Sequence, residues 1–212
     1  VGAEHTGAAY VFVRSDGTWM EQAKLTSVAA LPGDWFGRIV ALDGDTALIG
    51  SFEKVRVGGE GPGSAYVFVR SGDSWAEQAK LTGSDGSPGD GFGSDVELSG
   101  DSALIGAYSD QVGQATWAGS AYVFVRSGTA WTEQARLTAA DAMPFDCFGL
   151  GMCLLGDTAL IGAQTGSLPG APMAGAAYVF GRSGNVWTQQ AKLVALDASA
   201  NDRLGVSAAL SG

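Results

Sequence analysis

The amino-acid sequence predicts an all-β protein built from repeated four-stranded antiparallel units, the blades of a β-propeller. Three observations support this fold class: an internal repeat, short apolar runs separated by turn residues, and abundant glycine. Glycine supplies 33 of 212 residues without a three-residue period, and 46% of residues are hydrophobic. This composition suits many short strands joined by tight turns, and excludes collagen and a disordered chain.

The repeat is plainest in an aromatic-rich segment that reads GAAYVFVRS from Gly7 to Ser15. Related segments begin at residues 63, 119 and 175, so successive copies are 56 residues apart. The same spacing relates three other sets of identical residues: Trp19, Trp75, Trp131 and Trp187; Leu25, Leu81, Leu137 and Leu193; Asp34, Asp90, Asp146 and Asp202. We expect one domain over residues 1–212, with units at about 1–34, 35–90, 91–146 and 147–202, and 203–212 as a closing inner strand.

Each unit contains four strand-like runs, which in the second unit are Phe36–Leu42, Thr46–Gly50, Ala65–Arg70 and Trp75–Leu81. Turn residues separate the first pair at Asp43-Gly44-Asp45 and the last pair at Gly72-Asp73. Such short connections favour β-hairpins. In an up-and-down unit the tight turns share one face and the longer connections share the other.

The last hairpin of each unit predicts a side-chain cluster. With a two-residue loop, Arg14 lies opposite Trp19 and diagonal to Glu21, and the other units repeat this pattern, with Gln189 replacing glutamate in the last. We expect the arginine to contact the indole ring and to pair with the glutamate. Because all units share the cluster, we interpret it as architecture and not as an active site.

Two short glycine motifs resemble those of the FG-GAP repeat, which builds integrin-α-like β-propellers. The FG motif occurs at Phe36-Gly37, Phe92-Gly93 and Phe148-Gly149, and is relaxed to Leu204-Gly205. The GA motif occurs at Gly106-Ala107 and Gly162-Ala163, with Gly50-Ser51 as a variant and Gly2-Ala3 as a first copy. The resemblance covers essentially the whole chain and is strongest to bacterial repeats, with their G-[SA]-A-Y-V-F and W-x-[EQ]-Q-A-[KR]-L runs.

The resemblance also raises the question of calcium, because integrin-type blades often hold Ca²⁺ in a D-x-D-x-D-G loop. Here the corresponding connection is only Asp43-Gly44-Asp45 or its equivalents, which is too short to supply six to eight oxygen ligands. Asp45, Asp101 and Asp157 are therefore interpreted as turn residues. We expect no cofactor and no metal.

The two ends of the chain are complementary. Val1-Gly2-Ala3 is interpreted as the end of a second strand, and Leu204–Leu210 as an innermost strand without outer neighbours. Joining them would remove two exposed sheet edges. Three arrangements fit the sequence: closure of the chain on itself, closure or filament formation with other copies, and a fragment of a longer array.

Charge and motifs exclude several functions. With 12 basic against 22 acidic residues the net charge is −10, which disfavours nucleic acid, and no apolar run is long enough for membrane insertion. His5 is the single histidine, and no nucleophile elbow or phosphate loop occurs. Cys147 and Cys153 are interpreted as two buried free thiols. We therefore expect a non-enzymatic protein.

Residues that break the repeat are the better candidates for function, and they gather in the long loops. The exposed candidates for a ligand or partner face are Trp35, Glu53, Lys54, Arg56, Tyr108, Asp110 and Trp117. The leading hypothesis is an extracellular or cell-surface binding, adhesion or assembly module that uses this face or its open ends, with a protein, a glycan or other copies as partner. A lectin-like propeller with Trp117 or Tyr108 stacked on sugar is the alternative, followed by a hydrolase or lyase.

Overall fold

All regular secondary structure is β-strand in the part of the chain that the computed structural model describes, residues 6–30, 33–52 and 61–211. The first sheet holds β1 (Ala9–Ser15) and β2 (Thr18–Leu25). The second holds β3 (Ile39–Asp43), β4 (Thr46–Ser51), β5 (Ser64–Ser71) and β6 (Ser74–Leu81). The third holds β7 (Phe92–Ser99), β8 (Ser102–Ala107), β9 (Ser120–Ser127) and β10 (Ala130–Leu137). The fourth holds β11 (Phe148–Leu155), β12 (Thr158–Ala163), β13 (Ala176–Ser183) and β14 (Val186–Leu193).

Within each sheet, every strand pairs antiparallel with its neighbour in the sequence. This confirms the predicted four-stranded antiparallel units. β3 begins at Ile39 and not at Phe36, and Phe36 makes a parallel bridge with Gly7 of the preceding unit. The expected hairpin register is also present, with Arg14 opposite Trp19 and a two-residue turn at Asp16-Gly17.

The sheets pack face to face through three apolar clusters, one at each junction. Between the second and third sheets, Leu48 and Val67 meet Ile105, Tyr122 and Phe124, and all five are buried. The neighbouring residue on the central strand faces the opposite way, since Ile49 packs toward the first sheet. Successive side chains of one strand point to opposite faces of the sheet and so pack into two different junctions. This explains why these strands are apolar at nearly every position.

Both glycine motifs are explained by close approach between units. A Cβ added to Gly106 of the GA motif would lie only 2.0 Å from the carbonyl oxygen of Gly149, the FG glycine of the next unit. The same contact relates Gly50 to Gly93 and Gly162 to Gly205. No larger residue fits at the GA position without moving the adjacent backbone.

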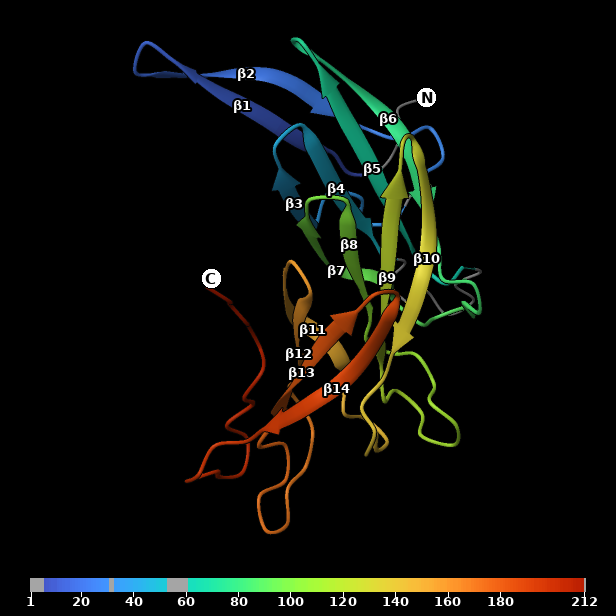
Figure 1. The fold of residues 1–212 in the computed structure, drawn as a ribbon, viewed down its shortest axis with the longest axis vertical. Helices are drawn as coiled ribbons and strands as arrows, with labels where there is room; N and C mark the ends of the chain where they lie inside the picture. The colour runs from blue at the N-terminus through green and yellow to red at the C-terminus, as the bar shows by residue number, and fades with distance from the viewer. Residues whose placement is uncertain (1–5, 31–32, 53–60, 212) are drawn as a thin grey trace.

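The four sheets follow one another along the long axis of the molecule (Figure 1). The β1–β2 hairpin lies at one end and the β11–β14 sheet at the other, so the described sheets do not close into a ring. The described residues therefore do not show the self-closure of four units, one of the arrangements that the sequence left open.

The expected inner strand over Leu204–Leu210 is not formed. Leu204 makes one parallel bridge with Gly175, as Phe36 and Phe92 do with their preceding units, but residues 205–211 belong to no strand. In the complete units the inner strand pairs with the strand that follows it, and within residues 1–212 no such strand follows here. The expectation for Val1-Gly2-Ala3 lies outside the described residues.

Candidate functional site

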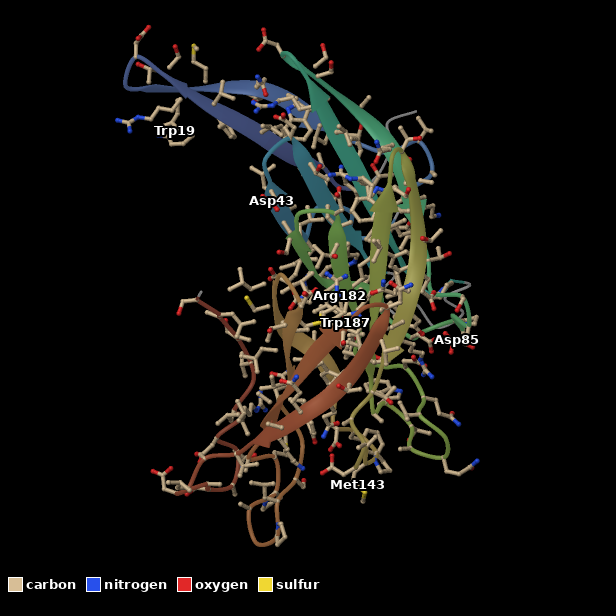
Figure 2. The ribbon with its side chains drawn as sticks, viewed as in Figure 1. Trp19, Asp43, Asp85, Met143, Arg182 and Trp187 are labelled. Atoms are coloured by element: carbon tan, nitrogen blue, oxygen red, sulfur yellow. The ribbon has the colours of Figure 1, made fainter. Side chains whose placement is uncertain are left out.

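Tight turns and long loops lie at opposite ends of each sheet, as expected for up-and-down strands. Figure 2 shows Trp19 and Asp43 near the turn ends of their sheets, and Asp85 and Met143 among the long loops. We call the surface formed by residues 82–91, 107–118 and 138–147, with Trp35 and Phe52 of the preceding unit, the long-loop face.

Five aromatic side chains form a continuous row across this face, which we call the aromatic ladder. Successive ring centroids are 6.0 Å apart for Trp35 and Phe52, 6.3 Å for Phe52 and Tyr108, 6.5 Å for Tyr108 and Trp117, and 6.2 Å for Trp117 and Phe145. Phe52 is buried, whereas Trp35, Trp117 and Phe145 are 40%, 46% and 60% exposed. The ladder therefore presents a broad apolar surface that spans two units.

Three members of the ladder adopt the left-handed backbone conformation, with φ of 57° at Trp35, 56° at Trp117 and 67° at Phe145. Other units fill the equivalent positions differently: Gly91 corresponds to Trp35, Met173 to Trp117, and Asn201 to Phe145. An aromatic residue costs about 1–3 kcal/mol in this conformation, and glycine avoids that strain. The left-handed conformation itself recurs at Met173 and Asn201, and at Cys147 and Arg203, the other counterparts of Trp35. The conformation therefore belongs to the repeat, and only the aromatic side chains are particular to the ladder.

A pocket of about 630 Å³ adjoins the ladder at Trp117. Its polar lining includes Asp85, Asp90, Ser109, Asp110 and Arg136. It opens beside the loop between β8 and β9 and the loop between β6 and β7. Pockets that combine an aromatic wall with a few converging polar groups are the usual form of a small-ligand site.

A buried ion pair organises the pocket. Arg136 Nη2 lies 2.6 Å from Asp110 Oδ2, and its Nε lies 3.4 Å from Asp85 Oδ2. Asp110 Oδ2 also accepts a hydrogen bond from Ser120 Oγ at 2.5 Å. Tyr122 Oη lies 3.1 Å from the same oxygen and makes its shorter hydrogen bond, of 2.7 Å, to Asp85 Oδ1. Since Asp110 is only 6% exposed, this set of donors compensates for its removal from water.

Burial and polar contacts have opposing effects on each of these groups, and the net result is a raised pKa for both Asp90 and Arg136. Burial, followed by the charges of Asp110 and Asp85, raises the pKa of Asp90 despite a hydrogen bond from the Ser87 amide. Burial alone would lower the pKa of Arg136, but its hydrogen bond and charge interaction with Asp110 raise it. The pocket therefore crowds three carboxylates around one permanent cation.

The structure brings together four of the residues that the sequence singled out. Trp35, Tyr108 and Trp117 lie in the aromatic ladder, and Asp110 lies in the adjoining pocket. The expectation that Asp110 is exposed was wrong, because its ion pair with Arg136 holds it inside the fold. Glu53, Lys54 and Arg56 lie outside the described residues. Sequence reasoning missed Arg136 and Phe145, although each breaks the repeat: Lys24, Lys80 and Lys192 replace the arginine, and Gly89 and Asn201 replace the phenylalanine.

The arginine–tryptophan cluster of each hairpin belongs to the architecture. Arg182 lies over the ring of Trp187 at 5.2 Å, as expected, and both are labelled in Figure 2. Its ion-pair partner is the turn residue Asp157 at 2.7 Å, where the sequence suggested a diagonal glutamate or glutamine. The expected partner was wrong because Glu133, in the equivalent position, bonds instead to Ser84 of the preceding unit.

Other candidate chemistry is limited. Cys147 and Cys153 are free and half-buried, and burial raises the pKa of the Cys147 thiol. Within the described ranges no three His, Cys, Asp or Glu side chains are grouped to hold a metal ion. A second pocket between the inner strands includes Asp95 and Glu97; burial and then Asp95 raise the pKa of Glu97 to about 7. None of the described residues forms a helix able to cross a membrane.

Comparison with known families gives four matches along the chain. The model of the FG-GAP repeat matches residues 19–68, 75–124, 131–180 and 187–212, which together exceed half of the sequence. Comparison with curated proteins finds no significant match. The four matches follow the structural period, since each begins at the tryptophan near the start of a unit's last strand. The chain therefore belongs to the FG-GAP repeat family.

Proposed function

We propose that this chain is a non-catalytic binding or adhesion module of an extracellular or cell-surface protein, and that its ligand binds the long-loop face. The observation that carries this proposal is the aromatic ladder, whose members Trp35, Trp117 and Phe145 expose their rings on one face. Exposed aromatic surface of this kind is typical of recognition sites. The negative net charge argues against nucleic acid as the partner.

A glycan is the favoured ligand class within this proposal. Trp117 offers a flat apolar ring, and the adjoining pocket offers carboxylate, guanidinium and hydroxyl groups that suit a polyhydroxylated ligand. A protein ligand is the alternative, and would use the whole ladder as an apolar contact surface.

Self-association through the open ends is a second mode of assembly. The indoles of the other units meet the preceding sheet, and Trp187 is only 9% exposed, whereas Trp19 on the first hairpin is 65% exposed. A second copy that placed its last sheet against β1 and β2 would cover Trp19 and continue the same junction. This mode leaves the long-loop face accessible.

Retention on immobilised surfaces tests the proposal. The purified chain would be passed over chitin, chitosan, cellulose and gelatin, and compared with Trp117→Met, which copies the Met173 of the next unit, and with Trp19→Met as a matched control. We expect retention on at least one surface that Trp117→Met abolishes and Trp19→Met preserves. Retention lost only in Trp19→Met would show that the open end, and not the long-loop face, makes the contact.

A further inference from the structure

The pocket beside Trp117 has an excess of negative charge. Asp85, Asp90 and Asp110 supply three carboxylates, and among the described residues Arg136 is the only basic side chain that lines the pocket. The guanidinium is engaged by Asp110 and Asp85, while the Asp90 carboxylate accepts a hydrogen bond from the Ser87 amide. Among the described residues, Asp90 forms no ion pair with a cation. A positively charged group would therefore be attracted to the space beside Asp85 and Asp90.

A second and independent feature of the pocket points to a ligand. Ser109 lines the pocket and is 6% exposed, yet its Oγ has no hydrogen-bond partner among the described residues. A buried hydroxyl without a partner is unfavourable by about 1–3 kcal/mol, so such groups usually have a ligand or water as partner. The hydroxyl can both donate to and accept from a polar ligand.

The apolar wall of the same pocket is the Trp117 ring, which continues into the aromatic ladder. A ligand that only satisfied the carboxylates, such as an ammonium ion, would leave this wall unused. A neutral sugar would use the wall but would leave the charge of Asp90 uncompensated. An acidic sugar would be repelled by the carboxylates.

The equivalent position between the third and last units lacks these properties. Asp141, the counterpart of Asp85, is paired with Lys192 at 2.6 Å, and Gly166 and Met173 replace Asp110 and Trp117. The charge of Asp141 is compensated, and the position has no aromatic wall. Within the described residues, only the pocket between the second and third units therefore combines the required groups.

From these observations we infer that the pocket binds a carbohydrate with a free amine, the protonated amine lying beside Asp85 and Asp90 and the sugar ring against Trp117. The inference rests on the proposed function, because it names the ligand class of the same long-loop face. The amine would donate to the carboxylates and to Ser109 Oγ, and neighbouring sugar rings of an oligomer would extend along the ladder.

Calorimetric titration of the full chain tests this inference with three matched probes: β-1,4-linked tetramers of glucosamine, of N-acetylglucosamine and of glucose. A charge-assisted hydrogen bond contributes about 1.5–3 kcal/mol, so the glucosamine tetramer should bind roughly 10–100-fold more tightly than the other two. The preference should shrink as salt is raised from about 20 to 200 mM. Trp117→Met should weaken all three tetramers.

Two variants locate the amine. Asp85→Asn combined with Asp90→Asn should reduce the preference for glucosamine to less than about threefold, while Asp141→Asn, at the counterpart of Asp85, should preserve it. Equal affinity for the three tetramers, a preference that survives the double variant, or tighter binding of tetralysine would each overturn the inference. In those cases, retention on a surface that Trp117→Met abolishes would still support the proposed function, so the two failures can be told apart.

Discussion

The indole Nε1 of Trp187 donates a hydrogen bond of 2.9 Å to Oε1 of Gln134 on the preceding sheet. The same bond joins Trp131 to Gln78 and Trp75 to Gln22, always 53 residues apart. Each glutamine sits at a β-bulge of its outermost strand, where the register with the neighbouring strand shifts. The bulge turns the amide toward the next unit, and so a local irregularity joins successive sheets.

The glutamine–tryptophan bond should contribute to stability. Gln134→Ala would leave the nearly buried Trp187 indole without an acceptor, so we expect the free energy of unfolding to fall by about 1–3 kcal/mol. Gln190 occupies the same bulge position in the last unit and accepts no indole among the described residues, so Gln190→Ala should change stability by less than about 0.5 kcal/mol. Urea denaturation measures both, and equal losses would contradict this role.

The contact between the GA and FG glycines should tolerate no side chain. Gly106→Ala would place a Cβ 2.0 Å from the carbonyl oxygen of Gly149, and we expect a loss of at least about 3 kcal/mol. The control is Gly100→Ala in an open turn, where nothing lies within 4 Å and only the positive φ of 58° costs about 1–2 kcal/mol. A Gly106→Ala protein as stable as the control would show that the sheets can separate at little cost.

Glu97 should make stability depend on pH. Its pKa is raised by burial and by Asp95 to about 7, against an ordinary value of 4.5. Between these two pH values the folded protein holds a proton that the unfolded chain has lost, so the contribution of Glu97 to stability falls as pH rises through this window. Glu97→Gln should match the parent protein at pH 4 and exceed its stability by about 1–3 kcal/mol at pH 8. A difference that does not vary with pH would exclude this ionisation as its cause.

Removal of calcium should have little effect. The carboxylates at the ends of the inner hairpins are engaged by arginines, with Asp101 2.7 Å from Arg126 and Asp157 2.7 Å from Arg182. We expect EDTA to shift the thermal midpoint by less than about 2 °C, because a ligand stabilises a protein only through a site that binds it. A fall of about ten degrees that added Ca²⁺ reverses would reveal a site that our interpretation of these turns lacks.

The fold could be predicted from the sequence because the same pattern of strands and turns occurs in every unit. Four copies of the Tyr-Val-Phe run and of the hairpin turns fix strand identity, and the observed strands confirm it. The arrangement of the sheets could not be predicted in the same way, because it depends on contacts between units. The glutamine bulges and the two-glycine contacts appear only when residues 43 to 53 positions apart are brought together.

The candidate site was predicted in part for a related reason. Tyr108, Asp110 and Trp117 lie in one loop that departs from the repeat, and such departures are visible in sequence. Arg136 lies at the end of a regular strand, where arginine in place of lysine appears conservative. Its importance emerges only from the buried Asp110 beside it, because a guanidinium can pair with two carboxylates where an ammonium would meet one.

Hydrogen–deuterium exchange during binding tests most directly whether the long-loop face is the ligand surface. The chain would be measured free and bound to a soluble oligomer of whichever surface retains it, with Trp117→Met as the control. The account predicts slower exchange in residues 82–91, 107–118 and 138–147, no change at the hairpin turns around Asp16 and Gly128, and no protection in the variant. Protection confined to those turns or to the exposed hairpin of β1 and β2, with residues 107–118 unchanged, would contradict it.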